Sequence, residues 1–449
     1  MTPLAGLLPL DPVPVAHGLG GAKDLPIPTE LAIAGAVAAL VVSFSVLALA
    51  WREPRFVGEA GGRPAPAWLD RVVSSTAFAV VLRVLGFAFF LYVGAAAVLG
   101  PDTLINPFFG VFYVWLWVGL VPLALVFGNW FRAVSPARTI VQLLGRAAGT
   151  SPGEGLYAYP ARWGYWPAAL GLLAFVWLEL VYPESTALGP VRLWCAAYLA
   201  IMVIGGAVFG ERWLEHADPF EVYSHLVGKL SVWGRRDGHL VVRSPLANLD
   251  TLTPKAGLTA VVGVLFGSTA FDSFRESTPW LQFVQRQGVD RMWPDTAALL
   301  AFSIGVAIIL AVATTLTGVD DDTPRRTLPD LFAHSVVPII VGYIVAHYLT
   351  YFVGYGQVTL VQMSDPLGTG ADYLGTADYT PSYWLTTQPA LIAVLKVAAV
   401  VAGHVLGVVA AHDRAVRLLP KRHQLTGQLP LLFAMVGFTV GGLYLLFAA

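Results

Sequence analysis

Long runs of apolar residues alternate with short polar segments along almost the whole chain. The runs reach about 20 residues, the length that an α-helix needs to cross the hydrocarbon core of a bilayer. They are continuous and do not alternate residue by residue, which excludes the strands of a transmembrane barrel. Ten stretches each predict one spanning helix, and they are 30–50, 75–99, 108–127, 164–182, 190–210, 256–274, 296–318, 332–354, 389–411 and 428–448. We therefore expect an all-α, polytopic helical membrane protein with about ten transmembrane helices.

Composition supports this interpretation. Of the 449 residues, 56% are hydrophobic and 12% are charged, whereas a soluble domain has roughly 25% charged residues. The net charge of -1 leaves no basic surface for nucleic acid. The single cysteine, Cys195, excludes an intrachain disulfide and a thiolate zinc site. We also find no nucleotide-binding glycine pattern, no zinc-protease motif and no nucleophile elbow.

The basic residues predict the orientation. Twenty of the 27 Lys and Arg residues lie in the alternate segments 51–73, 128–163, 211–255, 319–331 and 412–427, and five lie in the segments between them. By the positive-inside rule, the arginine-rich segments face the cytoplasm and both termini face outward. Arg83 lies within a span with no acidic residue at its level, and we expect its side chain to reach towards the inner side.

The end of the third predicted span resembles the end of the fifth. Residues 127–130 read Phe-Gly-Asn-Trp and residues 209–213 read Phe-Gly-Glu-Arg-Trp. Ser135 and Asp218 follow, each before a proline, which is typical of a helix N-cap with proline at the first helical position. The helix after each is amphipathic, and we expect both helices to lie on the inner membrane surface. We interpret this as an internal repeat of a helix pair plus an interfacial helix.

This repeat and the spans divide the chain into three parts. We expect an outward-facing tail at 1–29, a membrane half at 30–255 that contains the repeat, and a second half at 256–449. The second half includes an outward-facing loop at 355–388, which has no Lys or Arg and is rich in Gly, Asp and Tyr.

Ionisable residues at membrane depth are costly and so are candidates for function. Asp272, His347 and Lys396 lie on three different predicted spans, at roughly 5, 8 and 10 Å below the outer surface. Arg275 is one turn beyond Asp272, and Asp365 lies in the loop above. These residues predict an outward-facing polar pocket under a lid. The structural alternative is that Asp272 pairs with Arg275, that Lys396 extends to the surface, and that the loop is a packed cap.

The N-terminal tail contains a further candidate ligand. Ala16 could end a leader peptide, although Pro14 matches the usual cleavage pattern badly. Cleavage there would leave His17 as the first residue, and an N-terminal histidine can chelate copper through its amine and ring. The alternative is an ordinary outward-facing tail.

Several short strings stand out along the chain, and they are His17-Gly18, Asp24-Leu25-Pro26-Ile27-Pro28, Ala346-His347-Tyr348, Gly356-Gln357, Ser364-Asp365-Pro366, Gly403-His404 and Ala411-His412. Together they resemble a family of bacterial polytopic membrane proteins that is described as fenitrothion hydrolase. The resemblance implies hydrolysis of an organophosphate triester and a place in the bacterial cell membrane. It carries over no catalytic residues.

Phosphotriester hydrolysis needs an activated water and a cation on the phosphoryl oxygen, which a metal usually supplies. His347, Asp272 and Asp365 offer nitrogen and oxygen ligands for a divalent metal such as zinc or copper. Lys396 or Arg275 would stabilise the developing charge. We therefore expect a metal-dependent hydrolase that acts on a small-molecule substrate.

Two other classes remain open. A permease is suggested by the repeat and by Pro122, Pro338 and Gly342, which interrupt spans as in alternating-access transporters. A non-catalytic subunit of a membrane metalloenzyme, held to a partner membrane subunit, would also explain an outward-facing site.

Overall fold

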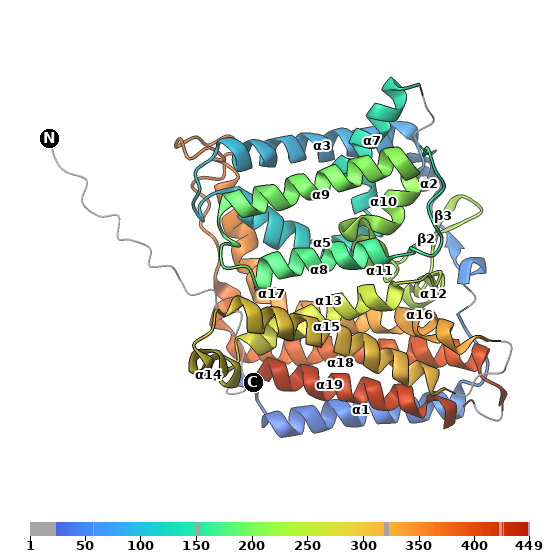
Figure 1. Ribbon diagram of the computed structural model, residues 1–449. Helices are drawn as coiled ribbons and strands as arrows, with labels where there is room; N and C mark the ends of the chain where they lie inside the picture. Colours follow the sequence, from blue (N-terminus) through green and yellow to red (C-terminus); the bar gives the residue numbers. More distant parts are fainter. Residues whose placement is uncertain are drawn as a thin grey trace.

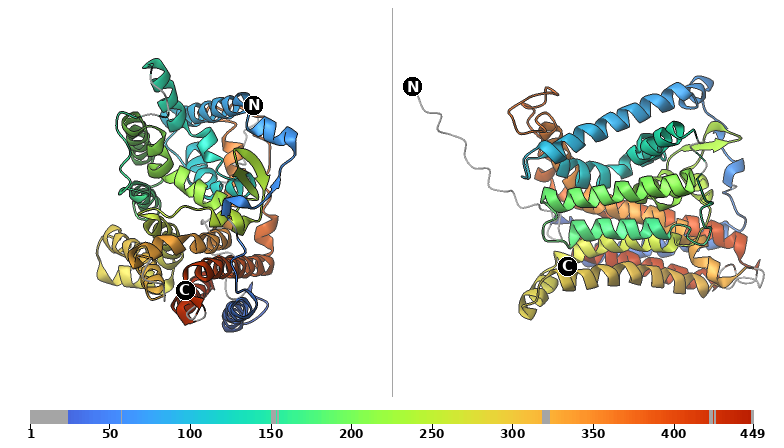
Figure 2. Two further views of the ribbon diagram at one scale, coloured as in Figure 1. Left: turned by 90° about the vertical axis from the view of Figure 1, so that its right-hand side faces the viewer. Right: turned by 45° about the horizontal axis from the view of Figure 1, so that its top comes forward.

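The computed structural model describes residues 24–56, 58–149, 153, 155–317, 323–421, 424 and 426–447. The chain is helical, with 73% of residues in helices and almost no strand. Most of the long helices lie side by side along one common direction (Figure 1), and Figure 2 shows several of them end-on. This confirms the all-helical fold class that the apolar runs predict.

Three short strands interrupt an otherwise helical order of elements in the described residues. Those of the first half are α1 (Thr29–Ala50), η2 (Gly58–Ala60), β1 (Arg63–Pro64), α2 (Ala67–Val73), α3 (Thr76–Leu99), α4 (Pro107–Phe109), η3 (Gly110–Val118), α5 (Leu120–Phe127), α6 (Phe131–Val134), α7 (Pro136–Ala147), α8 (Trp166–Leu180), α9 (Leu188–Phe209), α10 (Glu211–Ala217), α11 (Pro219–Gly228), β2 (Trp233–Arg236), β3 (His239–Val242) and α12 (Pro245–Asp250). Those of the second half are α13 (Leu258–Arg275), α14 (Thr278–Gln287), α15 (Met292–Thr315), η4 (Arg325–Thr327), α16 (Leu328–Phe332), η5 (Ala333–Val336), α17 (Val337–Gln362), η6 (Trp384–Thr387), α18 (Pro389–Leu418), η8 (Thr426–Gln428) and α19 (Leu429–Phe447).

Seven helices in the described part of the chain are long and apolar enough to cross a membrane. They are α1, α3, α9, α15, the segment Arg325–Gln362 with α17, α18, and the segment Thr426–Phe447 with α19. The π-helix η3 and α5 are bent by 45° and would make an eighth span together. Helices also occupy the other two predicted stretches, but α8 has only 15 residues and α13 is not among the seven. The protein is therefore a candidate multi-pass membrane protein.

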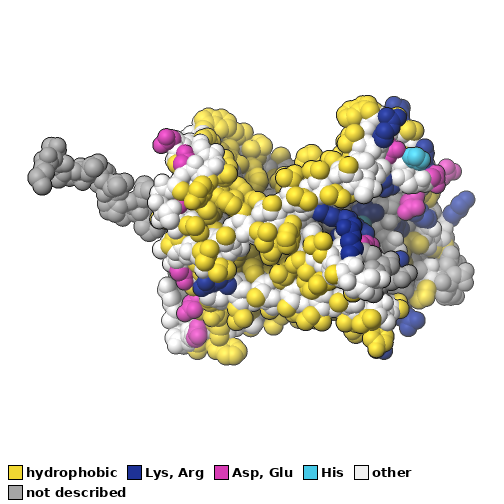
Figure 3. Space-filling model, turned by 90° about the horizontal axis from the view of Figure 1, so that it is seen from above, with side chains coloured by type: hydrophobic (Ala, Val, Ile, Leu, Met, Phe, Trp, Pro, Cys, Tyr) yellow, Lys and Arg dark blue, Asp and Glu magenta, His cyan; other side chains and the backbone are white. Residues whose placement is uncertain are grey.

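A small antiparallel sheet in the order β1-β3-β2 lies at one end of the bundle, near α2 and α12 (Figure 1). Trp233 pairs with Val242 across β2 and β3, and Arg63 pairs with the same Val242 across β1 and β3. In the face shown in Figure 3, apolar side chains cover most of the surface, and Lys and Arg side chains gather towards this end. This is the pattern expected of a protein whose middle faces lipid and whose end faces water.

Glycines allow α17 and α18 to approach each other closely. A Cβ atom on Gly342 would lie 2.4 Å from the carbonyl oxygen of Ala399, and one on Gly403 would lie 2.5 Å from that of Pro338. Small residues at helix contacts are typical of membrane proteins, where close backbone packing replaces the hydrophobic driving force. The two helices form one of the most extensive contacts of the described structure.

The chain turns sharply after α5 and again after α9. Gly128 (φ 77) and Gly210 (φ 67) both adopt a positive φ at the turn, which a residue with a side chain rarely adopts. Ser135 then accepts a hydrogen bond from the backbone of Arg138 at the start of α7. Asp218 accepts hydrogen bonds from two backbone amides at the start of α11. The two predicted N-caps are thus confirmed.

The predicted surface position of the second amphipathic helix is wrong. Nine of the ten residues of α11 are buried, and Tyr223 packs against Trp117 of η3 with ring centroids 5.1 Å apart. Its polar face is also buried, because Glu221 forms an ion pair with Arg138 of α7. The sequence pattern predicted that the polar face of this helix contacts lipid headgroups. In the structure it contacts a charged side chain inside the protein instead. By contrast, α7 keeps Leu143 and Leu144 exposed, and its end projects from the bundle (Figures 1 and 2).

The predicted loop at 355–388 begins too early. The helix α17 continues to Gln362, because this last part packs along η3: Trp115 Nε1 donates to the Gly356 carbonyl oxygen at 3.2 Å, and Thr359 contacts Gly110 closely enough that a Cβ there would overlap it. His347 lies 15 residues before this end, which is roughly 22 Å along the helix. The sequence analysis placed His347 roughly 8 Å below the outer surface, near the end of its span. In the structure His347 is farther than this from the end of its helix.

Candidate functional site

Asp272 of α13 and His347 of α17 form a buried pair, each with 4% of its surface exposed. His347 Nε2 lies 2.9 Å from Asp272 Oδ2, and the Tyr348 hydroxyl donates to the same oxygen at 2.7 Å. On the other side of the ring, Ser273 Oγ lies 3.1 Å from His347 Nδ1 and 3.1 Å from the Tyr343 hydroxyl. Two helices thus supply a continuous chain of polar groups in the interior.

The helical repeat explains why these groups meet. Tyr343 and His347 are four residues apart on α17 and so lie on one face. Asp272 and Ser273 are neighbours on α13, which packs against that face. The sequence placed the candidates Asp272 and His347 at a similar depth on two spans, and the structure brings them into contact.

A second carboxylate, Glu179 of α8, was missed. It interacts electrostatically with both Asp272 and Arg275, and its Oε2 is buried without a hydrogen-bond partner in the described residues. The signal was present in the sequence, since Glu179 is an acidic residue inside the predicted span 164–182. Arg275 itself forms its ion pair with Glu276, at 3.7 Å.

Two other candidates have partners elsewhere. Lys396 on α18 is buried, with 3% of its surface exposed, and the charge that acts on it is Asp24. Asp365 holds its own loop, because its carboxylate accepts from the backbone amides of Thr369 at 2.9 Å and Gly370 at 2.7 Å. These hydrogen bonds are the ones expected in the structural alternative, in which the loop packs as a cap.

The predicted metal centre is not assembled. Within the residues that the structure describes, no group of three or more His, Cys, Asp or Glu side chains is placed to hold a metal ion. His347 and Asp272 meet, but Asp365 makes its contacts inside the loop. His17 lies outside the described residues. Asp365 was expected to join the metal site because its loop follows the span that carries His347. The position of a loop along the chain does not determine the direction in which its side chains point.

Loop 363–388 gives a pH-dependent prediction. The pKa of Asp372 lies below its ordinary value of 3.8, first because Ser364 donates a hydrogen bond to it and then because backbone amides do. A depressed pKa stabilises the folded loop above pH 3.8, and this contribution is lost as the pH falls through the lower folded value. We expect Asp372→Asn to accelerate amide hydrogen exchange in residues 364–377 several-fold at neutral pH. The same substitution at Asp378 is the control, and equal exchange in both variants would contradict the prediction.

The buried pair can exchange a proton. A carboxylate and an imidazole in hydrogen-bond contact share one proton, and the neighbouring hydroxyls of Tyr348 and Ser273 can donate to or accept from them. The order Ser273–His347–Asp272 is also that of a serine-hydrolase triad, but with the two ring nitrogens exchanged relative to the usual arrangement. Proton exchange and nucleophilic attack by a serine could therefore both use Ser273, His347 and Asp272.

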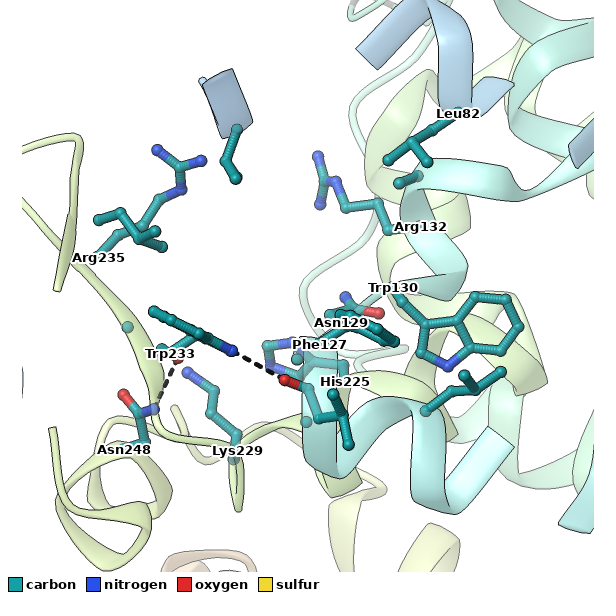
Figure 4. Close-up of a pocket in the computed structure, with 18 of the residues that line it drawn as sticks. Leu82, Phe127, Asn129, Trp130, Arg132, His225, Lys229, Trp233, Arg235 and Asn248 are labelled. Carbon is teal, nitrogen blue, oxygen red and sulfur yellow. Dashed lines mark hydrogen bonds between the residues drawn. The ribbon is translucent and has the colours of Figure 1, made fainter. Parts of the chain in front are cut away.

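A separate cavity of about 1090 Å³ lies among α3, α5, α11 and the β2–β3 hairpin. Asp272, Ser273 and His347 do not line it. Figure 4 shows Arg132 and Arg235 extending towards the same open space from opposite sides, above Trp130, Trp233 and Lys229. Sequence analysis did not predict this cavity, because its walls come from five separate parts of the chain; Arg83, which lines it, was the one signal.

Comparison with known proteins identified no relative: no protein family, no curated protein and no solved structure matches this chain.

Proposed function

We propose that this protein is a proton-linked membrane transporter in which Asp272 and His347 bind and release the coupled proton. The observation that carries the proposal is their direct contact at 2.9 Å, buried between α13 and α17. Titratable groups within spans are rare, and chains of Asp, Glu and His mark proton pathways in pumps and transporters. Glu179, which is electrostatically linked to Asp272, extends the pathway towards α8.

The architecture supports this class. The helix pair η3–α5 is bent, and π-helices such as η3 occur frequently at functional sites. We infer that α8 and α13 also cross the membrane, which gives ten spans with both termini outside. We further infer an internal duplication that relates α5–α7 to α9–α11, since Gly128 and Gly210 have matching backbone angles. The twenty basic residues on one side support insertion in a bacterial inner membrane.

The proton site is tested without knowledge of the substrate. Infrared difference spectra of the reconstituted protein, recorded from about pH 5 to about pH 9, should contain a carboxyl band that disappears in Asp272→Asn. The matched control is Asp295→Asn, because Asp295 on α15 is also buried but pairs with Arg291, the residue before that helix. Absence of any carboxyl band assigned to Asp272 in this range would contradict the proposal.

Coupling is then measured in proteoliposomes that enclose a pH-sensitive dye, with a panel of small organic solutes added in turn. We expect solute-dependent proton movement in the wild-type protein, and a decrease of about tenfold or more in Asp272→Asn and His347→Gln. Equal rates in these variants and in Asp295→Asn would contradict coupling through the pair.

A membrane-embedded hydrolase is the second candidate. It is favoured by the hydrogen-bonded order of Ser273, His347 and Asp272 and by the resemblance to the hydrolase family. In that reaction Ser273 Oγ would attack phosphorus while His347 takes its proton. A fluorophosphonate probe distinguishes the two classes, because attack forms an Oγ–P bond and releases fluoride. Labelling that is lost in Ser273→Ala would favour the hydrolase over the transporter.

A further inference from the structure

The cavity among α3, α5, α11 and the β2–β3 hairpin has one apolar wall. The first turns of α3 supply Phe78 and Leu82, and α5 supplies Leu123, Val126 and Phe127. Val126 and Phe127 are 56% and 64% exposed, so this wall is open to whatever surrounds the bundle. Around a membrane protein that surrounding medium is lipid, and apolar side chains there contact acyl chains.

The helix α3 is little covered by the rest of the protein. Only 6% of its apolar window is buried, the lowest share among the seven candidate spans. It touches α6 at Gly86, where a Cβ atom would lie 2.4 Å from the Val134 carbonyl oxygen. The turns before that contact point line the cavity with Phe78, Leu82 and Arg83. A lipid acyl chain beside α3 would thus contact apolar side chains of this helix up to the charged side chain of Arg83.

The opposite wall is basic. Six Lys and Arg residues line the cavity against two acidic residues, Glu59 and Glu211. The six basic residues are Arg83, Arg132, Arg138, Lys229, Arg235 and Arg243. A cavity with this excess of positive charge attracts an anion.

Four of these cations have no carboxylate in hydrogen-bond contact. Arg83 makes no hydrogen bond or ion pair with any residue that the structure describes. Lys229 donates to the hydroxyl of Thr251 at 2.6 Å. Arg235 donates to Ser74 and to a backbone carbonyl, and Arg243 donates only to backbone carbonyls. Arg132 and Arg138, in contrast, are paired with glutamates.

The positive charge does not depend on histidine. Burial, together with the charge of Lys229, lowers the pKa of His225 to about 3, so its ring is neutral at physiological pH. The arginines keep their charge at any such pH. The cavity therefore presents a permanent cationic wall beside an apolar one.

We propose that this cavity binds a phospholipid with an anionic phosphodiester headgroup, drawn from the leaflet on the arginine-rich side of the protein. The headgroup lies against Arg83, Lys229 and Arg235, and the acyl chains follow α3 and α5. Basic pockets between transmembrane helices on the cytoplasmic side are known to take anionic lipid headgroups. The proposal is independent of the Asp272–His347 pair, which does not line the cavity.

Lipid binding is measured on the full-length protein in detergent, by native mass spectrometry and by thermal stabilisation. The probes are phosphatidylglycerol and phosphatidylcholine with identical acyl chains. We expect phosphatidylglycerol to bind about tenfold or more tightly, and we expect Arg83→Gln with Arg235→Gln to reduce its affinity to that of phosphatidylcholine. Equal affinity of the two lipids for the wild-type protein would overturn the proposal.

Two further variants separate the cavity from general surface charge and from misfolding. Arg71→Gln removes an exposed charge on the neighbouring helix α2, outside the cavity, and should leave binding unchanged; the same loss as in the double variant would overturn the proposal. Leu123→Trp fills the apolar wall without a change in charge and should also abolish preferential binding. Unchanged binding in Leu123→Trp would show that the lipid lies elsewhere.

Competition identifies the source of the phosphate. Glycerol phosphate offers the headgroup chemistry without acyl chains. We expect it to leave phosphatidylglycerol binding unchanged at millimolar concentration, because the apolar wall contributes to affinity. Displacement of the lipid by glycerol phosphate would assign the cavity to a soluble anion and overturn the proposal of a lipid.

Discussion

Arg138→Met is expected to destabilise the protein by about 3–5 kcal/mol, because it leaves the Glu221 carboxylate buried without its main partner. Arg138 Nη2 lies 2.6 Å from Glu221 Oε1 and 2.8 Å from Oε2, and both side chains are 3% exposed or less. Arg138 Nη1 is also 3.0 Å from Glu211 Oε2, although without the geometry of a hydrogen bond. The pair joins α7 to α11, so its loss affects the contact between these two helices.

The measurement is the free energy of unfolding in mixed micelles, by titration with a denaturing detergent. The matched control is Arg132→Met, since Arg132 belongs to the same charge cluster but its side chain is 43% exposed; we expect a loss of only about 0–1 kcal/mol. Addition of Glu221→Leu to Arg138→Met should restore most of the stability, because no charge is then left buried. Equal losses in Arg138→Met and Arg132→Met would contradict this account.

Gly403→Val is expected to cost about 3 kcal/mol or more, because the new side chain meets backbone that cannot move aside cheaply. A Cβ at Gly403 already lies 2.5 Å from the Pro338 carbonyl oxygen, and 3.3 Å from the Cα atoms of Ile339 and Gly342. The helices α17 and α18 would have to separate, which would also disturb His347 on the next turns of α17.

The matched control is Gly437→Val on α19, where a Cβ atom would have no neighbour within 4 Å. Both variants change the intrinsic helix preference in the same way, so the difference between their unfolding free energies isolates the helix–helix contact. We expect the free energy of unfolding of the Gly437 variant to lie within about 1 kcal/mol of the wild-type value. A Gly403 variant as stable as the Gly437 variant would show that the helices can adjust.

The candidate site was partly predictable. Asp272 and His347 were found because charged groups inside apolar runs are rare. Ser273 and Tyr343 were not found, since hydroxyls are common in such helices and reveal their role only through contacts. Asp365 was misplaced because a loop has no fixed rise per residue, and its carboxylate turned to the amides of its own loop.

The sequence by itself determined that the chain is helical, with apolar helices long enough to cross a membrane, and which helix starts are capped by Ser135 and Asp218. These features depend on neighbours within about 20 residues, through hydrophobic length and local hydrogen bonds. Only the tertiary structure decided that α11 is buried, that Arg138 meets Glu221 across 83 residues of chain, and that separate segments enclose a basic cavity beside α3. Such contacts depend on how helices pack side by side, and periodicity along the chain carries no information on which distant residue will be the neighbour.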